Sequence, residues 1–78
     1  MEDRSFEFML FDLSKELLEK ANLAKADAMN SSSDYDKGRQ FALYEVISLL
    51  GQQAEAFGIE LNKIGLEGVD PERDLLGT

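Results

Sequence analysis

Residues 41–50, FALYEVISLL, decide the fold of this chain of 78 residues. Only Glu45 and Ser48 interrupt their apolar character, so a helix through this stretch is apolar on more than one side. In a folded protein, a helix of that kind is covered on more than one side. We therefore expect an all-α fold in which a long helix, over residues 34–57, contacts several neighbours.

The sequence predicts both ends of this helix. Ser33 is a typical N-cap and has Asp36 three residues later, a weak form of the capping box. Gly58 is a typical residue just after a helix C-terminus. Gly51 lies inside the helix at a cost of about 1 kcal/mol relative to alanine, which predicts a close backbone approach or a kink there.

A second long helix is expected over residues 6–29, with Ser5 or Asp3 as its N-cap. Its main apolar face repeats every three or four residues and consists of Phe6, Leu10, Leu13, Leu17, Ala21, Ala24 and Ala28. Additional apolar residues lie off that face: Phe8, Met9, Phe11 and Leu18. Because a solvent-facing helix rarely carries so many, we expect the C-terminal segment or a second chain to cover them.

Short helical turns are expected over residues 60–64, which end at Gly65, and over residues 71–76, which begin at Asp70-Pro71. This segment is rich in apolar residues and should lie across the long helices as a partial lid. The predicted fold is an antiparallel hairpin of two long helices with short C-terminal turns, in a single domain over residues 1–78. Because the segment covers only part of the apolar surface, we expect two hairpins to pair in a dimeric four-helix bundle.

The composition excludes several kinds of function. The chain has no cysteine and no histidine, so it lacks disulfides, the usual zinc ligands and the usual general base. Its net charge of −8 is divided as −3, −2 and −3 among residues 1–30, 31–57 and 58–78, which disfavours nucleic acids and anionic membranes. No apolar run reaches the ~20 residues that span a bilayer. We expect a cytoplasmic protein without a cofactor or metal.

One stretch has part of the pattern of a calcium-binding loop. Asp34, Asp36 and Glu45 take positions 1, 3 and 12 of an EF-hand loop. Position 5, however, is Gly38 instead of an oxygen ligand, and position 6, which needs glycine, is Arg39. Because residues 37–45 also read as continuous helix, helix capping and solvated charge explain these carboxylates better.

Glu45 is the single acid inside the apolar stretch, and Lys37, Arg39 or a residue of another chain is its expected partner. We interpret this pair as a structural polar contact and not as a catalytic one. Together with Tyr35 and Tyr44, the two basic residues would also suit recognition of a carboxylate or phosphate. Side chains of this type more often cover the core with their stems and keep their heads in water.

No motif identifies a family, so function follows from surfaces. The leading hypothesis is a non-enzymatic protein–protein interaction module that forms a homodimer. Its predicted interaction surface consists of Phe6, Phe8, Met9, Phe11, Leu18, Phe41, Tyr44, Val46 and Leu49, with Arg39 and Glu45 as a polar contact. The alternative is an acidic inhibitor of a basic partner, such as an immunity protein, an antitoxin or a DNA mimic. A third hypothesis, an enzyme or ligand carrier, rests only on Arg39, Tyr44 and Glu45.

Overall fold

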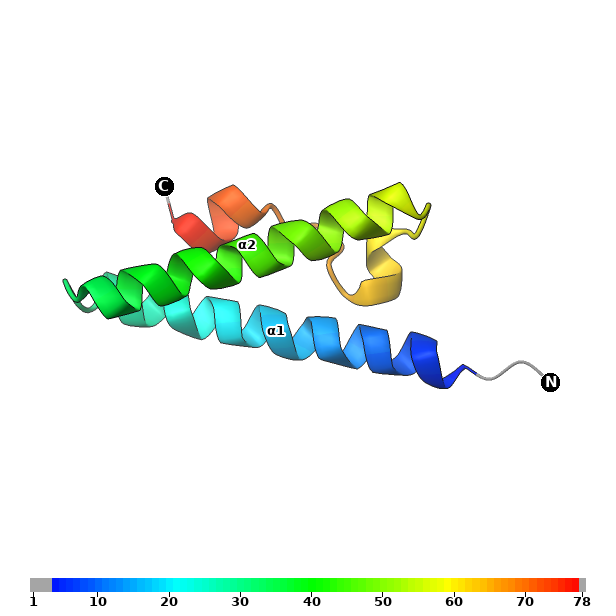
Figure 1. Ribbon diagram of the computed structural model, residues 1–78, viewed down its shortest axis with the longest axis horizontal. Helices are drawn as coiled ribbons and strands as arrows, with labels where there is room; N and C mark the ends of the chain where they lie inside the picture. The colour runs from blue at the N-terminus through cyan, green and yellow to red at the C-terminus, as the bar shows by residue number, and fades with distance from the viewer. Residues whose placement is uncertain (1–3, 78) are drawn as a thin grey trace.

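The computed structural model describes residues 4–77, and every regular element in that part of the chain is helical. Helix α1 (Ser5–Met29) and helix α2 (Asp34–Ala56) form an antiparallel hairpin (Figure 1). A 3₁₀ turn, η1 (Leu61–Ile64), and a single wide π-type turn, η2 (Glu72–Leu76), follow. The predicted pair of long helices with short C-terminal turns is confirmed.

Local hydrogen bonds fix the ends of α2 where the sequence predicts them. The Ser33 hydroxyl accepts the Asp36 backbone N–H at 3.2 Å. At the other end, Gly58 adopts a positive φ of 68°, and the Ile59 N–H donates to the Ala54 carbonyl over 2.7 Å. This is the Schellman arrangement, in which glycine takes the left-handed position after the last turn.

The start of α1 differs from the expectation. Ser5 is the first helical residue and not the cap, because Arg4 occupies the N-cap position without a side-chain capping hydrogen bond. The alternative cap, Asp3, lies outside the described residues. The helix therefore begins one residue earlier than the apolar pattern predicts.

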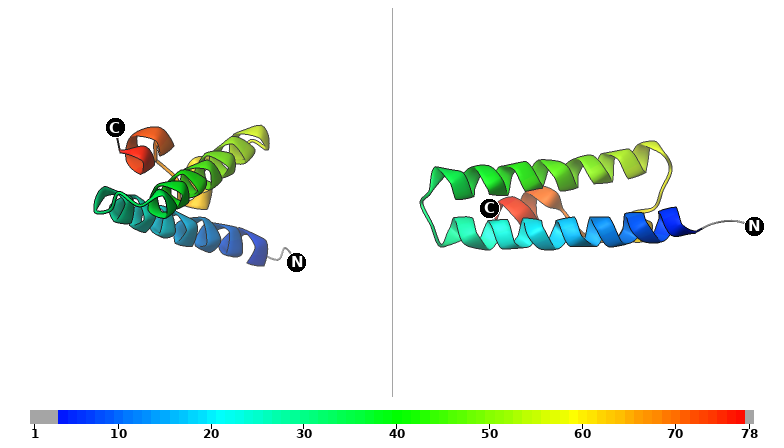
Figure 2. Two further views of the ribbon diagram at one scale, coloured as in Figure 1. Left: turned by 60° about the vertical axis from the view of Figure 1, so that its left-hand side comes forward. Right: turned by 60° about the horizontal axis from the view of Figure 1, so that its bottom comes forward.

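The C-terminal segment, residues 59–77, packs on one side of the hairpin and completes the core. In the right-hand view of Figure 2, both long helices lie in front of this segment. The main core cluster of buried residues draws on both long helices and on the C-terminal segment, and consists of Ala21, Ile47, Ala54, Ile64, Leu66 and Leu75. Two side chains hold η2 in place: Lys25 Nζ donates to the Asp74 carbonyl at 2.9 Å, and Gln40 Nε2 donates to the Leu75 carbonyl at 2.8 Å. The predicted partial lid is thus confirmed.

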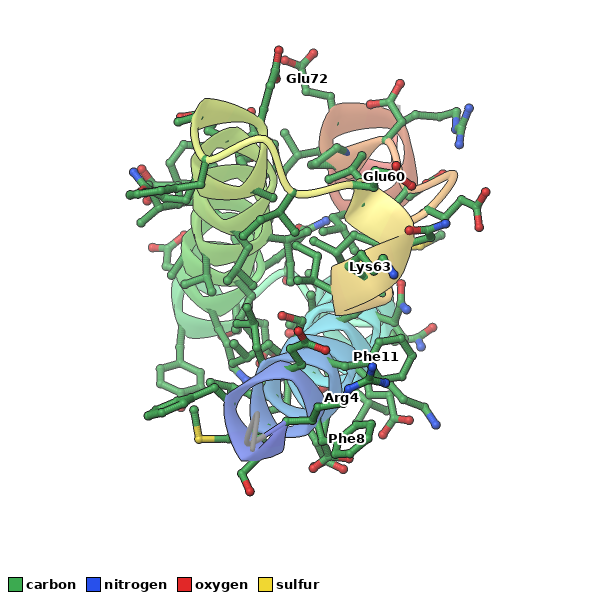
Figure 3. All side chains as sticks on the ribbon, turned by 90° about the vertical axis from the view of Figure 1, so that its right-hand side faces the viewer. Arg4, Phe8, Phe11, Glu60, Lys63 and Glu72 are labelled. Carbon is green, nitrogen blue, oxygen red and sulfur yellow. The ribbon has the colours of Figure 1, made fainter. Side chains whose placement is uncertain are left out.

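The lid covers α1 unevenly. Gly65 ends η1 with a φ of 72°, and a Cβ at this position would lie 3.3 Å from the Phe11 ring. Figure 3 shows Phe11 pointing toward η1, whereas Phe8 points away from it. Phe8 consequently remains 68% exposed. The chain covers part of one of these two rings and leaves the other to solvent.

The predicted main face of α1 is wrong at two positions. Phe6 is 77% exposed and Leu13 is 47% exposed, whereas Ser14 is fully buried. Ser14 lies four residues after Leu10 and three before Leu17, and therefore on the same side of the helix. Because the C-terminal segment docks on one side of α1, the buried stripe is rotated toward that side and away from Leu13.

Replacement of Ser14 by alanine is expected to stabilise the protein. The Ser14 hydroxyl is buried and has no hydrogen-bond partner, and burial of an unpaired hydroxyl costs about 1–3 kcal/mol. Alanine removes this oxygen with little change in volume and has a higher helix propensity. Urea unfolding followed by circular dichroism should show a free energy of unfolding that is higher by about 1 kcal/mol. A lower value would mean that the hydroxyl has a bonding partner.

Candidate interaction surfaces

The predicted interaction residues separate into two groups. Leu18 and Tyr44 are partly buried and pack against the core of their own chain. The other seven are more than a third exposed and are Phe6, Phe8, Met9, Phe11, Phe41, Val46 and Leu49. The Phe41 ring lies beside the Tyr44 ring at a tilt of 41°, with ring centroids 5.6 Å apart. These seven do not form one surface, because they point to different sides of α1 and α2.

One ion pair marks the side of the hairpin that the C-terminal segment leaves open. Arg39 Nη1 lies 3.0 Å from Asp27 Oδ2 and joins the two long helices. Met9 precedes Asp27 by about five helical turns, and Phe57 follows Arg39 by about five, so both lie on the side of this ion pair. Lys25, two residues before Asp27, projects from nearly the opposite side of α1 and reaches η2.

The exposed apolar residues on this side form what we call the open face. On α1 they are three or four residues apart, and on α2 they are about three full turns apart, so on each helix they lie on one side. The residues of the open face are Phe6, Met9, Leu13, Val46 and Phe57. Their exposed fractions range from 37% for Val46 to 77% for Phe6. No part of residues 4–77 crosses in front of the two helices in the right-hand view of Figure 2. The open face is thus an apolar surface that the described chain does not cover.

The apolar pattern of the sequence assigns three of these residues, Phe6, Leu13 and Phe57, to the main apolar faces of their helices. Asp27 and Arg39 carry opposite charges on either side of the predicted connection. This pair is the sequence signal that could have indicated which sides of the two helices lie next to each other. Of the partners expected for Glu45, Arg39 pairs instead with Asp27. Glu45 is exposed, and its side chain makes no hydrogen bond or ion pair within the described part of the chain.

A groove of about 540 Å³ lies between α2 and the C-terminal segment, on a different side of α2 from the open face. We call it the acidic groove. Its apolar lining consists of Tyr44, Ile47, Ile59, Leu61, Leu66, Val69 and Pro71, and its acidic lining of Glu55, Glu60, Asp70 and Glu72. Glu60 and Glu72 appear in Figure 3 on the side where α2 and this segment meet. None of the residues that line the groove is basic.

Gly51 lines this groove, and its environment differs from the expectation. A Cβ built at Gly51 would meet no atom within 4 Å, so no close approach inside the chain requires glycine here. The helix nevertheless continues through this position from Asp34 to Ala56. Glycine inside a helix lowers stability by about 1 kcal/mol relative to alanine. At this position, the absence of a side chain leaves the groove open.

Charged groups also organise the turn at η2. Arg73 Nε donates to Asp74 Oδ1 at 2.8 Å, and Asp74 Oδ2 accepts the Asp70 backbone N–H at 2.9 Å. The hydrogen bond from Arg73 and that from the Asp70 backbone lower the pKa of the Asp74 carboxyl to about 2. Asp70 in turn accepts the Arg73 backbone N–H at 3.3 Å. These bonds shape the wall of the groove around Asp70.

Within residues 4–77, no three acidic side chains gather closely enough to hold one metal ion. The stretch from Asp34 through Glu45 is continuous helix, which cannot wrap around calcium. None of the described helices has the length and apolar character to cross a bilayer.

No protein-family model matches the chain, and no curated protein or solved structure shows significant similarity to it. Function must therefore follow from the open face and the acidic groove.

Proposed function

We propose that this protein is a non-enzymatic, helical protein–protein interaction module that forms a homodimer through the open face. The observation that supports this proposal is the open face itself, where five large apolar side chains on two adjacent helices are at least 37% exposed. Contiguous apolar patches on a monomer rarely exceed a few hundred Å², and larger ones typically mark interaction sites.

The size of the hairpin suits a stable dimer. Each long helix is about 35 Å long, and two side by side are about 20 Å wide, so the whole side of the hairpin that carries the open face offers about 700 Å². A standard protein interface buries about 800 Å² per partner. Two open faces paired about a two-fold axis place four helices around a shared apolar core, as in a four-helix bundle.

The small core of one chain also favours association. Ile47 and Leu75 are the only large apolar side chains among the described residues that are less than 2% exposed, and three of the seven buried apolar residues are alanines. A chain of this size buries only about 60% of its unfolded surface. Small domains without disulfides or metals commonly gain the remaining stability by association.

Sedimentation velocity at about 100 μM protein tests the dimer, since weak dimers with a Kd near this value are still populated. We expect a species of twice the chain mass of 8.7 kDa. Met9→Glu places a charge on the open face and should shift the population toward monomer by about tenfold or more in Kd, because a buried, unpaired carboxylate is costly.

Phe8→Glu is the matched control. Phe8 is adjacent in sequence and at least as exposed as Met9, but it points about 100° away around α1. This variant should remain dimeric, and circular dichroism should show full helix content for both. A wild-type protein that sediments as a monomer at this concentration would refute the dimer, and equal dissociation of both variants would refute the open face as its interface.

A further inference from the structure

The acidic groove is a second surface, separate from the open face, and its charge is one-sided. The chain as a whole has two acidic residues for each basic one, whereas the groove is lined by four carboxylates and no basic side chain. Both ion pairs of the described residues lie outside this set, since they join Arg39 to Asp27 and Arg73 to Asp74. Arg73 lies near Asp70 and offsets part of its charge, whereas no ion pair of the described residues involves Glu55, Glu60 or Glu72. The groove therefore collects an excess of negative charge above an apolar floor.

The four carboxylates are too dispersed for one small cation. They come from α2, from the start of η1 and from both sides of Pro71 at the start of η2. No three of the described acidic residues meet the geometry for a shared metal ion. Compensation of the excess negative charge thus requires several cationic groups held at different points along the groove.

The floor and length of the groove suit a peptide. Its lining on α2 extends from Tyr44 to Glu55, about three turns or 16 Å, which equals about five residues of extended chain. Apolar side chains cover the floor, including Ile47, Leu66 and Val69. A volume of about 540 Å³ falls within the range of ligand pockets, about 300–1,000 Å³.

Gly51 supplies an independent observation. Nothing within the chain occupies the space next to its α-carbon, yet it lines the groove at a position where alanine would favour the helix. A glycine here gives an occupant direct access to the α2 backbone. Gly38 is also in α2 and also has free space around it, but it does not line the groove.

We propose that the acidic groove binds a basic, amphipathic peptide segment of a partner protein. Lysine or arginine side chains of that segment pair with the carboxylates at the rim, its apolar side chains lie on the floor, and its backbone passes close to Gly51. This proposal rests on the groove alone and does not depend on the dimer.

Fluorescence anisotropy tests it with a labelled leucine–lysine peptide as the probe, at low salt. We expect saturable binding that weakens as salt is added, because exposed charge pairs are screened. The same peptide with glutamine in place of lysine should bind at least about tenfold more weakly. Spermine, a polycation without apolar side chains, should displace the labelled peptide much less effectively than the unlabelled peptide does at equal charge concentration. Equal binding of the glutamine peptide, or displacement by spermine as effective as that by the unlabelled peptide, would overturn the proposal.

Two matched pairs of variants locate the binding site. Gly51→Leu fills the groove and should weaken peptide binding by about tenfold or more, whereas Gly38→Leu on the same helix should not. Glu55→Gln should weaken it about two- to fivefold, as expected for one exposed charge pair, whereas Glu45→Gln, outside the groove, should leave it unchanged. If the members of either pair behave alike, the peptide binds elsewhere and the proposal fails.

Stability measurements distinguish a direct loss of peptide binding from poor folding of a variant. Gly51→Ala should raise the melting temperature, since alanine favours helix, while it weakens peptide binding; poor folding cannot produce that combination. Sedimentation of the groove variants should match the wild type, and Met9→Glu should bind the peptide normally. Failure of the dimer and failure of the groove are therefore distinguishable.

Discussion

Ile47→Ala is expected to remove a large part of the stability of the protein. Ile47 is 1% exposed and is the largest fully buried side chain of α2. Truncation of a buried isoleucine to alanine costs about 2–5 kcal/mol, because transfer free energy is lost and a cavity remains. A chain of this size has a total free energy of unfolding of about 4–12 kcal/mol. Urea unfolding followed by circular dichroism should show a lower midpoint with an unchanged slope.

Leu49→Ala is the control for this change. Leu49 is in the same helix two residues later and is 56% exposed, so the same kind of truncation should cost less than about 1 kcal/mol. Similar losses for the two variants would mean that α2 buries a different side from the one described. Such a result would also move the open face and the acidic groove.

Leu75→Ala is expected to detach η2 from the hairpin. Leu75 is the one fully buried side chain of η2, and the side-chain hydrogen bonds that reach η2 from the hairpin are those from Lys25 and Gln40 to backbone carbonyls. Loss of the leucine side chain costs about 2–5 kcal/mol, more than two such bonds provide at about 1 kcal/mol each. Amide hydrogen exchange should show loss of protection in residues 66–77, with protection retained in the middle of α1 and α2.

Leu76→Ala provides the comparison, since Leu76 is adjacent and only half-buried. It should leave most of the protection in residues 66–77 intact. A uniform loss of protection throughout the chain in Leu75→Ala would show instead that the segment and the hairpin unfold as one unit. Peptide binding in the acidic groove should fall in Leu75→Ala, because the segment forms one wall of that groove.

Features that depend on neighbours in sequence could be predicted from the sequence. The Ser33 cap and the stop at Gly58 involve residues within one or two helical turns, where side-chain chemistry and backbone conformation act directly. The lid could also be predicted, because so many apolar residues in a short segment require burial. None of these predictions requires knowledge of the rotation of each helix about its own axis, that is, of which side faces its neighbours.

Features that depend on that rotation could not be predicted. Leu13 and Ser14 are adjacent, and an apolar pattern assigns the leucine to the core. The C-terminal segment docks on the side of Ser14, however, and that choice depends on contacts between residues far apart in the chain. The pairing of Arg39 with Asp27 depends on the same kind of contact between the two helices. The acidic groove left no continuous signal, because its carboxylates are brought together only by folding.

The docking of the C-terminal segment also has a kinetic consequence. The hairpin forms by contacts across a short connection between α1 and α2, whereas the bonds that hold η2 join residues 35 and 49 positions apart. Contacts over long separations carry a larger loop-closure entropy and tend to form later in folding. The two long helices can therefore pair first and the segment close over them last. Interactions of the segment then govern chiefly how fast the native protein unfolds, and not how fast it folds.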